Sequence, residues 1–248
     1  MLCSALQRKI LAAPRLHAFP APGGCLAGRV SLRFSQMNGK TQSVSPQTVC
    51  DRCGTCCQAG GPALHREDLP LFDADVLTRA HLVTLRRGEP VHDNVAGVLA
   101  ELPEEVVKIA GLAGAQACRF HDVAARACAI HDNAPLECRA LFCRDTSGIE
   151  AVYATGRLTR ADLVGSVGAL WELVSFHDAR FSAGEAAALA RRAVRADAAA
   201  RQALAELVRA EAQFRQEFCE RTGLGPDDLD FYFGRALSRV CAPFGLSL

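Results

Sequence analysis

The chain has 248 residues, of which 12 are cysteine, with a formal net charge of +1 and 50 % hydrophobic residues. This balance excludes an intrinsically disordered chain, which would have less apolar content or a larger net charge. It also argues against nucleic-acid binding through overall positive charge, because such proteins are basic. Cysteine is the residue whose abundance requires an explanation.

The first 49 residues differ in composition from the rest, because they contain no Asp or Glu but carry six basic residues. An acid-free segment with Arg and Ser resembles an organelle transit peptide. The alternative is a translation start assigned too early, with Met37 as the true one. The Ala-, Arg- and Gly-rich style of the remaining sequence suggests a bacterial source. We therefore predict that residues 1–44 are a disordered or mis-assigned leader, and we base no function on them.

The cysteines are unevenly distributed, since eight of the 12 lie between Cys50 and Cys143. Disulfides would require an oxidising compartment and therefore a secretory signal. Arg8 and Lys9 interrupt the apolar core that such a signal needs, and no segment approaches the ~18 apolar residues of a membrane span. We therefore expect a cytoplasmic protein without membrane contact, in which clustered cysteines bind metal or carry out redox chemistry.

The sharpest motif is the segment Cys50-Asp-Arg-Cys53-Gly-Thr-Cys56-Cys57. Each CxxC step directs two sulfurs at one centre, and Gly54 permits the tight backbone that amide-to-sulfur hydrogen bonds need. Cys56 and Cys57 are adjacent, so we expect their side chains to diverge and a single ion to accept both only with strain. The pair suggests either one ligand and one bystander or two neighbouring centres.

Later cysteines are available to complete the site. Two segments of the form Cys-x-apolar-His-Asp, at 118–122 and 128–132, predict short strands joined by a turn. The segment 134–143 predicts a short helix with Asn133 as its N-cap. Its two cysteines are five residues apart, about 140° around a helix, and would reach one site only if the helix ended between them.

Together these motifs resemble the YkgJ-type cysteine-cluster family, also called the CxxCxxCC domain and described as a zinc- or iron-chelating domain. The resemblance covers roughly residues 50–144, with the cysteines in the expected order. The chain departs from the family where His131 replaces the usual Tyr, as a candidate replacement ligand, and Ala134 the usual Arg. The resemblance implies metal binding without a settled reaction. The candidate metal ligands are Cys50, Cys53, Cys56, Cys57, Cys118, Cys128, Cys138 and Cys143.

Two kinds of metal centre suit eight thiolates. Zinc accepts four thiolates, or three thiolates and an imidazole, so eight cysteines could hold two ions. An iron–sulfur cluster is often held by a run of CxxC steps plus one remote cysteine, which the start of this motif matches more closely. The flagellin lysine N-methylases, which carry a similar cluster, are regarded as iron–sulfur proteins. We therefore prefer an iron–sulfur cluster as the cofactor, with zinc as the alternative.

The rest of the chain predicts a scaffold around the cysteines and a helical region after them. Residues 82–85 and 106–109 are predicted strands. We expect an α+β fold, mainly α, in which a small irregular metal-organised cysteine module at residues 45–146 is followed by an α-helical region at 147–248.

Within the helical region, Thr159 and Ser182 are predicted N-caps, and the helix after Thr159 is expected to continue past Leu173. A break is expected near Asp197, and Gly223 should end the long stretch that follows. A last helix should run from residue 226 to 239. Six arginines between residues 191 and 215 are interpreted as a solvated face paired with Glu206, Glu211 and Glu217 rather than as an RNA surface. Cys219 and Cys241, which lack ligand-like spacing, are predicted to be buried thiols.

Motifs of the common enzyme classes are absent from the sequence, including GxGxxG, the P-loop, GxSxG and HExxH, and enzyme activity is left open. His121-Asp122 is a weak acid–base candidate. The first hypothesis is a metal-binding module with a structural or electron-transfer role and an unidentified redox or protein partner. The alternatives are a cluster-dependent modifying enzyme, methyltransferase-like or redox, and a metal-trafficking protein.

Overall fold

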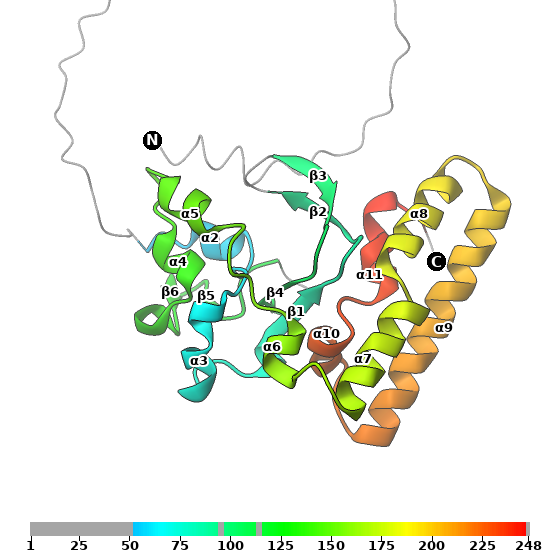
Figure 1. The fold of residues 1–248 in the computed structure, drawn as a ribbon. Coiled ribbons are helices and arrows are strands. Elements are labelled where there is room, and N and C mark those ends of the chain that lie inside the picture. Colours follow the sequence, from blue (N-terminus) through cyan, green and yellow to red (C-terminus); the bar gives the residue numbers. More distant parts are fainter. Residues whose placement is uncertain (1–51, 94–96, 113–115, 247–248) are drawn as a thin grey trace, which may run out of the picture.

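The computed structural model describes residues 52–93, 97–112 and 116–246 (Figure 1). About 51 % of the described residues are helical, and the strands form small antiparallel sheets, so the α+β, mainly α class is confirmed. The predicted leader at 1–44 and the predicted ligand Cys50 lie outside the described residues. Among the described residues, no helix combines the length and apolar character that a membrane crossing requires.

Short elements make up the first part of the fold. The helices there are α2 (Thr55–Gln58), η1 (Arg66–Asp68), α3 (Pro70–Asp73), η2 (Arg79–His81), η3 (His131–Asn133), α4 (Leu136–Ala140) and α5 (Ser147–Val152). Three antiparallel pairs accompany them: β1 (Leu82–Leu85) with β4 (Val106–Ile109), β2 (Pro90–Asp93) with β3 (Val98–Glu101), and β5 (His121–Asp122) with β6 (Ala127–Cys128). The predicted strands at 82–85 and 106–109 are thus confirmed. The cysteine hairpin is present, but its strands are shorter than the predicted 118–122 and 128–132, and residues 131–133 form η3 instead.

The second part of the fold is helical. Its helices are α6 (Arg160–Val164), α7 (Ala169–Arg180), α8 (Ala183–Val194) and α9 (Ala198–Thr222), then η4 (Pro226–Asp228), α10 (Leu229–Tyr232), α11 (Leu237–Cys241) and η5 (Ala242–Phe244). The three long helices, α7, α8 and α9, lie on the other side of the molecule from the cysteine module (Figure 1). Helices α8 and α9 pack together over a core that includes Ala186, Ala190 and Leu204. Small alanines on the facing side of α8 allow this close approach.

The predicted helix boundaries hold where side chains cap the helices. Thr159 and Ser182 accept hydrogen bonds from the backbone N–H groups three residues later, as N-caps do. Asp197 caps α9 after the expected break, and Gly223 ends α9 at φ 73°. These capping predictions are confirmed.

Three helix predictions are wrong for local reasons. The helix expected from Thr159 past Leu173 divides into α6 and α7, because Gly165 and Gly168 between them have φ values of 80° and 97°. The helix expected at 226–239 is similarly divided at Gly234, with φ 68°. Pro135 rather than Asn133 precedes α4, and no side chain caps that helix.

The cysteine module and the helical region share a core. Phe231 of α10 is fully buried beside Leu82 and Cys118 in one apolar cluster. The Thr84 hydroxyl also donates to the Phe231 carbonyl oxygen at 2.6 Å. The strand pair β1–β4 therefore connects the cysteine module to the helices, while the division predicted at residue 146 stays a prediction.

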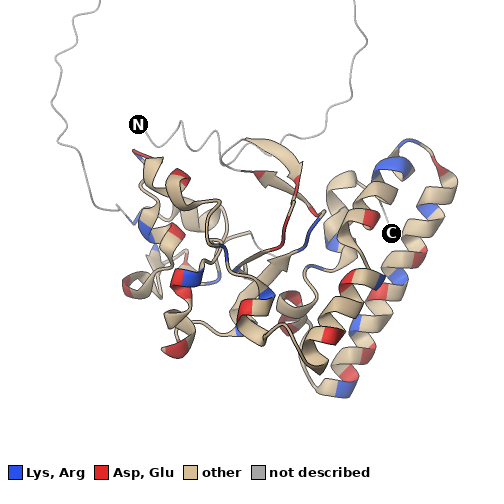
Figure 2. Ribbon diagram, in the orientation of Figure 1, with Lys and Arg blue, Asp and Glu red and all other residues tan. Residues whose placement is uncertain are grey.

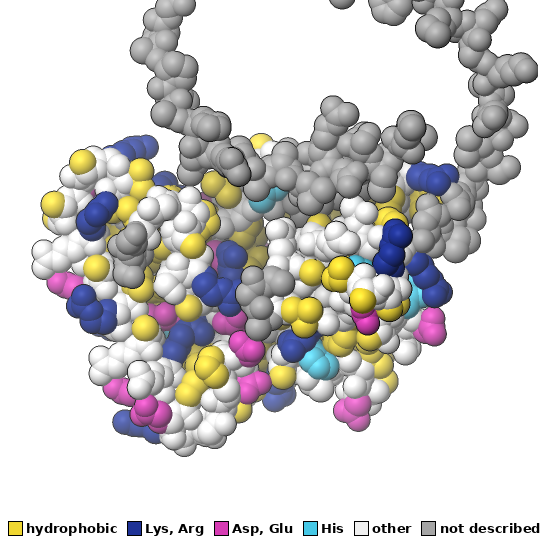
Figure 3. All heavy atoms as spheres, turned by 180° about the vertical axis from the view of Figure 1, so that it is seen from behind, with side chains coloured by type: hydrophobic (Ala, Val, Ile, Leu, Met, Phe, Trp, Pro, Cys, Tyr) yellow, Lys and Arg dark blue, Asp and Glu magenta, His cyan; other side chains and the backbone are white. Residues whose placement is uncertain are grey.

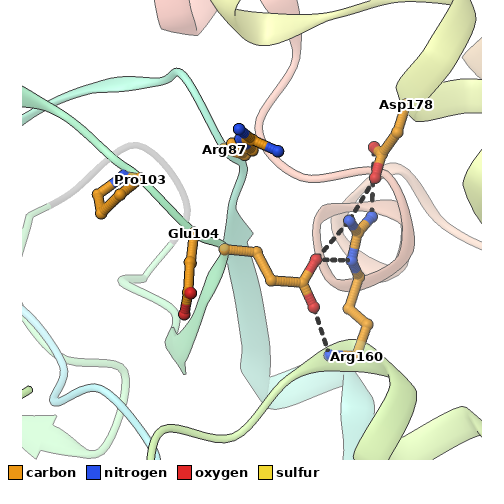
Figure 4. A pocket seen from close by; sticks show the side chains of 6 residues that line it. Arg87, Pro103, Glu104, Arg160 and Asp178 are labelled. Carbon is orange, nitrogen blue, oxygen red and sulfur yellow. Dashed lines mark hydrogen bonds and ion pairs between the residues drawn. The ribbon is translucent and has the colours of Figure 1, made fainter. Parts of the chain in front are cut away.

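Buried ion pairs hold the same junction. Arg160 is 3 % exposed and bridges Glu105 and Asp178 at a pocket of about 420 Å³ (Figure 4). Its guanidinium also donates to the Tyr232 carbonyl at 2.7 Å. Because an isolated buried charge would be strongly unfavourable, these partners are required for Arg160 to lie there.

Charges on the helices are mixed in sign. Basic and acidic residues are mixed along α8 and α9 (Figure 2), and charged side chains of both signs are interspersed with hydrophobic ones on the back of the molecule (Figure 3). Arg215 pairs with Glu211, whereas Glu206 and Glu217 instead accept hydrogen bonds from glutamines one turn earlier. The predicted pairing of arginines with glutamates therefore holds for Glu211 alone of the three glutamates considered.

Candidate metal centre

One cavity of about 630 Å³ brings together every described cysteine of the predicted ligand set. The cysteines that line it are Cys53, Cys56, Cys57, Cys118, Cys128, Cys138 and Cys143. Cys241 is instead fully buried in the helical core, as predicted, whereas Cys219 on α9 is only half-buried, contrary to the prediction. Segments distant in sequence thus meet at the cavity, although the ligand role of each cysteine stays a prediction.

Helix α2 presents the adjacent pair of cysteines. Gly54 precedes it at φ 77°, a left-handed conformation that glycine adopts without strain, and Cys56 and Cys57 follow in a single turn. Their Sγ atoms lie 3.9 Å apart. This separation is close to the edge of a tetrahedral zinc–thiolate site, about 3.8 Å for Zn–S bonds of ~2.3 Å.

The expectation that these two side chains diverge is therefore wrong. Neighbouring residues point about 100° apart around a helix, but rotation about the Cα–Cβ bond can bring their sulfurs together. The separation of the two sulfurs is thus one that two ligands of a single metal atom would have.

The hairpin β5–β6 contributes the next two cysteines. The backbone N–H of Cys118 donates to the Cys57 carbonyl oxygen at 2.7 Å, which fixes the start of the hairpin beside α2. Cys128 lies on β6, opposite His121 of β5. Residues more than sixty positions apart are therefore held at one wall of the cavity by backbone hydrogen bonding.

Helix α4 and the segment after it contribute Cys138 and Cys143. The helix ends at Ala140, and Leu141 is extended. The chain therefore turns between the two cysteines, and both line the cavity. Both cysteines can therefore reach one site, as expected from the sequence if the helix ended between them.

Comparison with known protein families agrees with this geometry. Residues 49–152 match the model of the CxxCxxCC family, whose description reads "Putative zinc- or iron-chelating domain". The chain is therefore similar to this family over residues 49–152, the segment called the CxxCxxCC domain below. No curated protein and no solved structure gives a significant match. The match includes α5, beyond the expected boundary at 146, and Ile149 of α5 lines the cavity.

Burial and proximity strongly affect proton binding by the thiols of the CxxCxxCC domain. A hydrogen bond to Cys57, together with burial, raises the pKa of the Cys56 thiol, and the same bond lowers the pKa of Cys57. Cys138 is exposed as a residue, but desolvation of its thiol by the surrounding cavity, then repulsion from Cys56 and other thiolates, raises its pKa. A thiophilic cation would relieve this repulsion, and its binding would displace the protons.

A buried polar network, which sequence reasoning missed, anchors α4 of the CxxCxxCC domain. The Glu137 carboxylate accepts from the backbone N–H of Ala63 at 2.8 Å and lies 3.4 Å from His65 Nε2. Asp68, fully buried, accepts from the N–H groups of His65 and Leu136 at 2.9 and 2.8 Å. These contacts position the helix that carries Cys138.

Lys108 is a second residue that the sequence did not single out. It lies on β4 between buried Val107 and Ile109, and its side chain lines the cysteine cavity. Burial lowers its pKa, while Glu137 opposes that effect. A lysine within an otherwise apolar strand is the sequence signal that could have identified it. As an ammonium group it would offset part of the negative charge of a thiolate site.

Two histidines also line the cavity, His121 and His131. His131 is half-buried, whereas His121 is 4 % exposed and its Nε2 lacks a hydrogen-bond partner among the described residues. The fit to a metal centre thus rests on the donor set, which combines clustered thiols with imidazoles. Within the described parts of the chain, no three Cys, His, Asp or Glu side chains already have the arrangement of a metal site.

Proposed function

We propose that the CxxCxxCC domain binds an iron–sulfur cluster or zinc in the cysteine cavity, with a structural or electron-transfer role. The observation that carries this proposal is the gathering of seven cysteines from α2, β5–β6 and the α4 segment around one cavity. A bound metal would hold these short elements together, since each of them is too short to be stable alone.

The contact between Cys56 and Cys57 supports a centre in which one metal atom takes both sulfurs. A tetrahedral zinc ion satisfies this condition. So does a [2Fe–2S] cluster, in which four cysteines are shared between two irons. We retain the iron–sulfur cluster as the preferred cofactor, because the CxxC run with remote cysteines suits it.

Anaerobic purification of the full chain, followed by metal analysis, sulfide analysis and a visible spectrum, tests the proposal. A brown protein with absorbance near ~400 nm and labile sulfide would establish a cluster. A colourless protein that retains zinc would establish the zinc form. A protein that retains neither metal after reconstitution would contradict the proposed function.

A modifying enzyme is the second candidate, and the size of the cavity is the observation that favours it. About 630 Å³ lies within the range of ~300–1,000 Å³ typical of small-molecule sites and exceeds the need of a single ion. Equilibrium dialysis of the metal-loaded protein against S-adenosylmethionine tests the methyltransferase-like form, and absence of binding would exclude it. The trafficking alternative draws on the solvent exposure of Cys138 and predicts rapid transfer of metal to a chelator.

A further inference from the structure

We propose that His121 is a further ligand of the metal centre and binds the metal through Nε2. This inference rests on the proposed function, since it concerns the same cavity. It adds an imidazole other than the sequence candidate His131 to a donor set made up mainly of cysteines.

The hydrogen bonding of His121 leaves one ring nitrogen available. Nδ1 lies 3.2 Å from the Ala127 carbonyl oxygen. A carbonyl only accepts, so the proton of a neutral ring is on Nδ1 and Nε2 carries a lone pair. Nε2 is buried and lacks a hydrogen-bond partner among the described residues. A buried polar atom without a partner is unfavourable, and a metal ion would satisfy it.

The ring also lies against the first cysteine loop. A Cβ placed on Gly54 would lie 2.6 Å from Cε1 and 2.7 Å from Nε2 of His121. The ring edge that carries Nε2 therefore faces the turn between Cys53 and Cys56. Glycine at position 54 is required both by its positive φ and by the space that His121 occupies.

The contact between Nδ1 and a backbone carbonyl has a known consequence for metal binding. Metal-ligating histidines commonly donate their other ring N–H to a carbonyl or carboxylate, which fixes the tautomer and the ring orientation. An imidazole is an ordinary partner for three thiolates on zinc, and imidazoles replace cysteines on one iron of some [2Fe–2S] clusters. His121 would make the centre less negative by one charge than a thiolate in its place.

His131 provides a matched comparison. It lines the same cavity, but its side chain is half-buried and its ring nitrogens can be hydrated. We therefore expect His131 to contribute little to metal binding.

Nitrogen NMR of the full chain labelled with ¹⁵N-histidine tests the proposal during zinc titration. The expected result is a zinc-dependent shift of the Nε2 resonance of a ring protonated at Nδ1, which is lost in His121→Leu and retained in His131→Leu. Bound zinc without any such shift, or a shift that persists in His121→Leu, would overturn the role of His121 alone. If His121→Leu does not fold, correlations that connect each ring to its assigned backbone resonances in the wild-type protein labelled with ¹³C and ¹⁵N make the assignment.

The two proposals fail in different ways in this experiment. A wild-type chain that retains no metal would overturn the proposed function and, with it, the role of His121. A chain that binds metal through sulfur alone, as X-ray absorption would show by a missing nitrogen shell at ~2.0–2.1 Å, would leave the proposed function standing and overturn only this inference.

Discussion

The Sγ atoms of Cys56 and Cys57 lie 3.9 Å apart, with both side chains at the wall of the cysteine cavity. If one metal atom takes both, then Cys56→Ser and Cys57→Ser should each weaken metal binding. We expect losses beyond the roughly 10- to 100-fold that follows removal of outer-shell partners. Competition with a chromophoric chelator measures the affinity.

Cys219→Ser is the matched control, because Cys219 is half-buried on α9 and does not line the cavity. Its metal affinity should equal that of the wild type. Equal affinity in Cys56→Ser or Cys57→Ser would show that the corresponding sulfur is not a ligand.

Gly54→Ala should destabilise the fold and displace His121. The substitution places a Cβ within 2.7 Å of two ring atoms at a backbone φ of 77°. We expect a loss of about 2–4 kcal/mol, as left-handed strain of ~1–2 kcal/mol adds to steric overlap. Urea unfolding of the metal-free protein measures it.

Gly223→Ala separates these two causes. Gly223 has nearly the same left-handed conformation as Gly54, with φ 73° and ψ 5° against φ 77° and ψ −2°, but a Cβ there meets nothing within 4 Å. Its loss should be limited to about 1–2 kcal/mol. If both variants lose the same amount, the close approach of His121 to Gly54 is not a constraint on the fold.

Replacement of Arg160, which is itself buried, should remove the main cation beside the partly buried carboxylates of Glu105 and Asp178, and leave Asp178 only the longer 3.8 Å contact with Arg86. We expect Arg160→Ala to lower the free energy of unfolding by about 3–5 kcal/mol, which is typical of a broken buried ion pair. Arg192→Ala, whose exposed pair with Asp197 is solvated, should cost less than about 1 kcal/mol. Denaturant unfolding of both variants gives the comparison, and similar small losses would contradict a structural role for Arg160.

Acid should weaken the helical core through Glu211, which is 1 % exposed. Burial alone would raise its pKa, but contacts with His177 and Arg215 outweigh burial and lower it. The pKa of Glu211 is therefore lower in the folded state than its value of about 4.5 in the unfolded state. The ionised carboxylate stabilises the folded protein above about pH 4.5, and this stabilisation is lost as pH falls through the folded-state pKa.

Glu211→Gln should therefore flatten the dependence of unfolding free energy on pH below about 4.5. Glu206→Gln, an exposed site on the same helix, serves as the control and should keep the wild-type slope. Chemical unfolding measured from pH 7 to pH 3 gives both slopes. An unchanged slope in Glu211→Gln would show that other carboxyls cause the acid sensitivity.

Metal removal should loosen the cysteine module more than the α8–α9 pair. A ligand present at 1,000 times its dissociation constant adds about 4 kcal/mol to stability. The helices α8 and α9 have an apolar core of their own, which includes Leu204 and Phe181. Hydrogen exchange before and after chelation should therefore show increased exchange in β5–β6 and α4, and equal changes throughout would indicate one cooperative unit.

Features of the fold that depend on near neighbours could be predicted from the sequence. The caps at Thr159, Ser182 and Asp197 are formed by side chains and backbone groups three residues apart. The strand at 82–85 follows from local composition. Predictions failed where one residue changed the local backbone, as Gly165 did in dividing an expected helix.

The sequence by itself determined which cysteines are candidates, because the spacing of Cys53, Cys56 and their successors is a local property of the chain. Only the tertiary structure decided how they meet. The hydrogen bond from Ala63 to Glu137 spans 74 residues, and the approach of His121 to Gly54 depends equally on packing between distant segments. Such contacts depend on the simultaneous position of several elements, and no local pattern encodes them. The convergence of the Cys56 and Cys57 sulfurs likewise depends on side-chain rotation within the packed site.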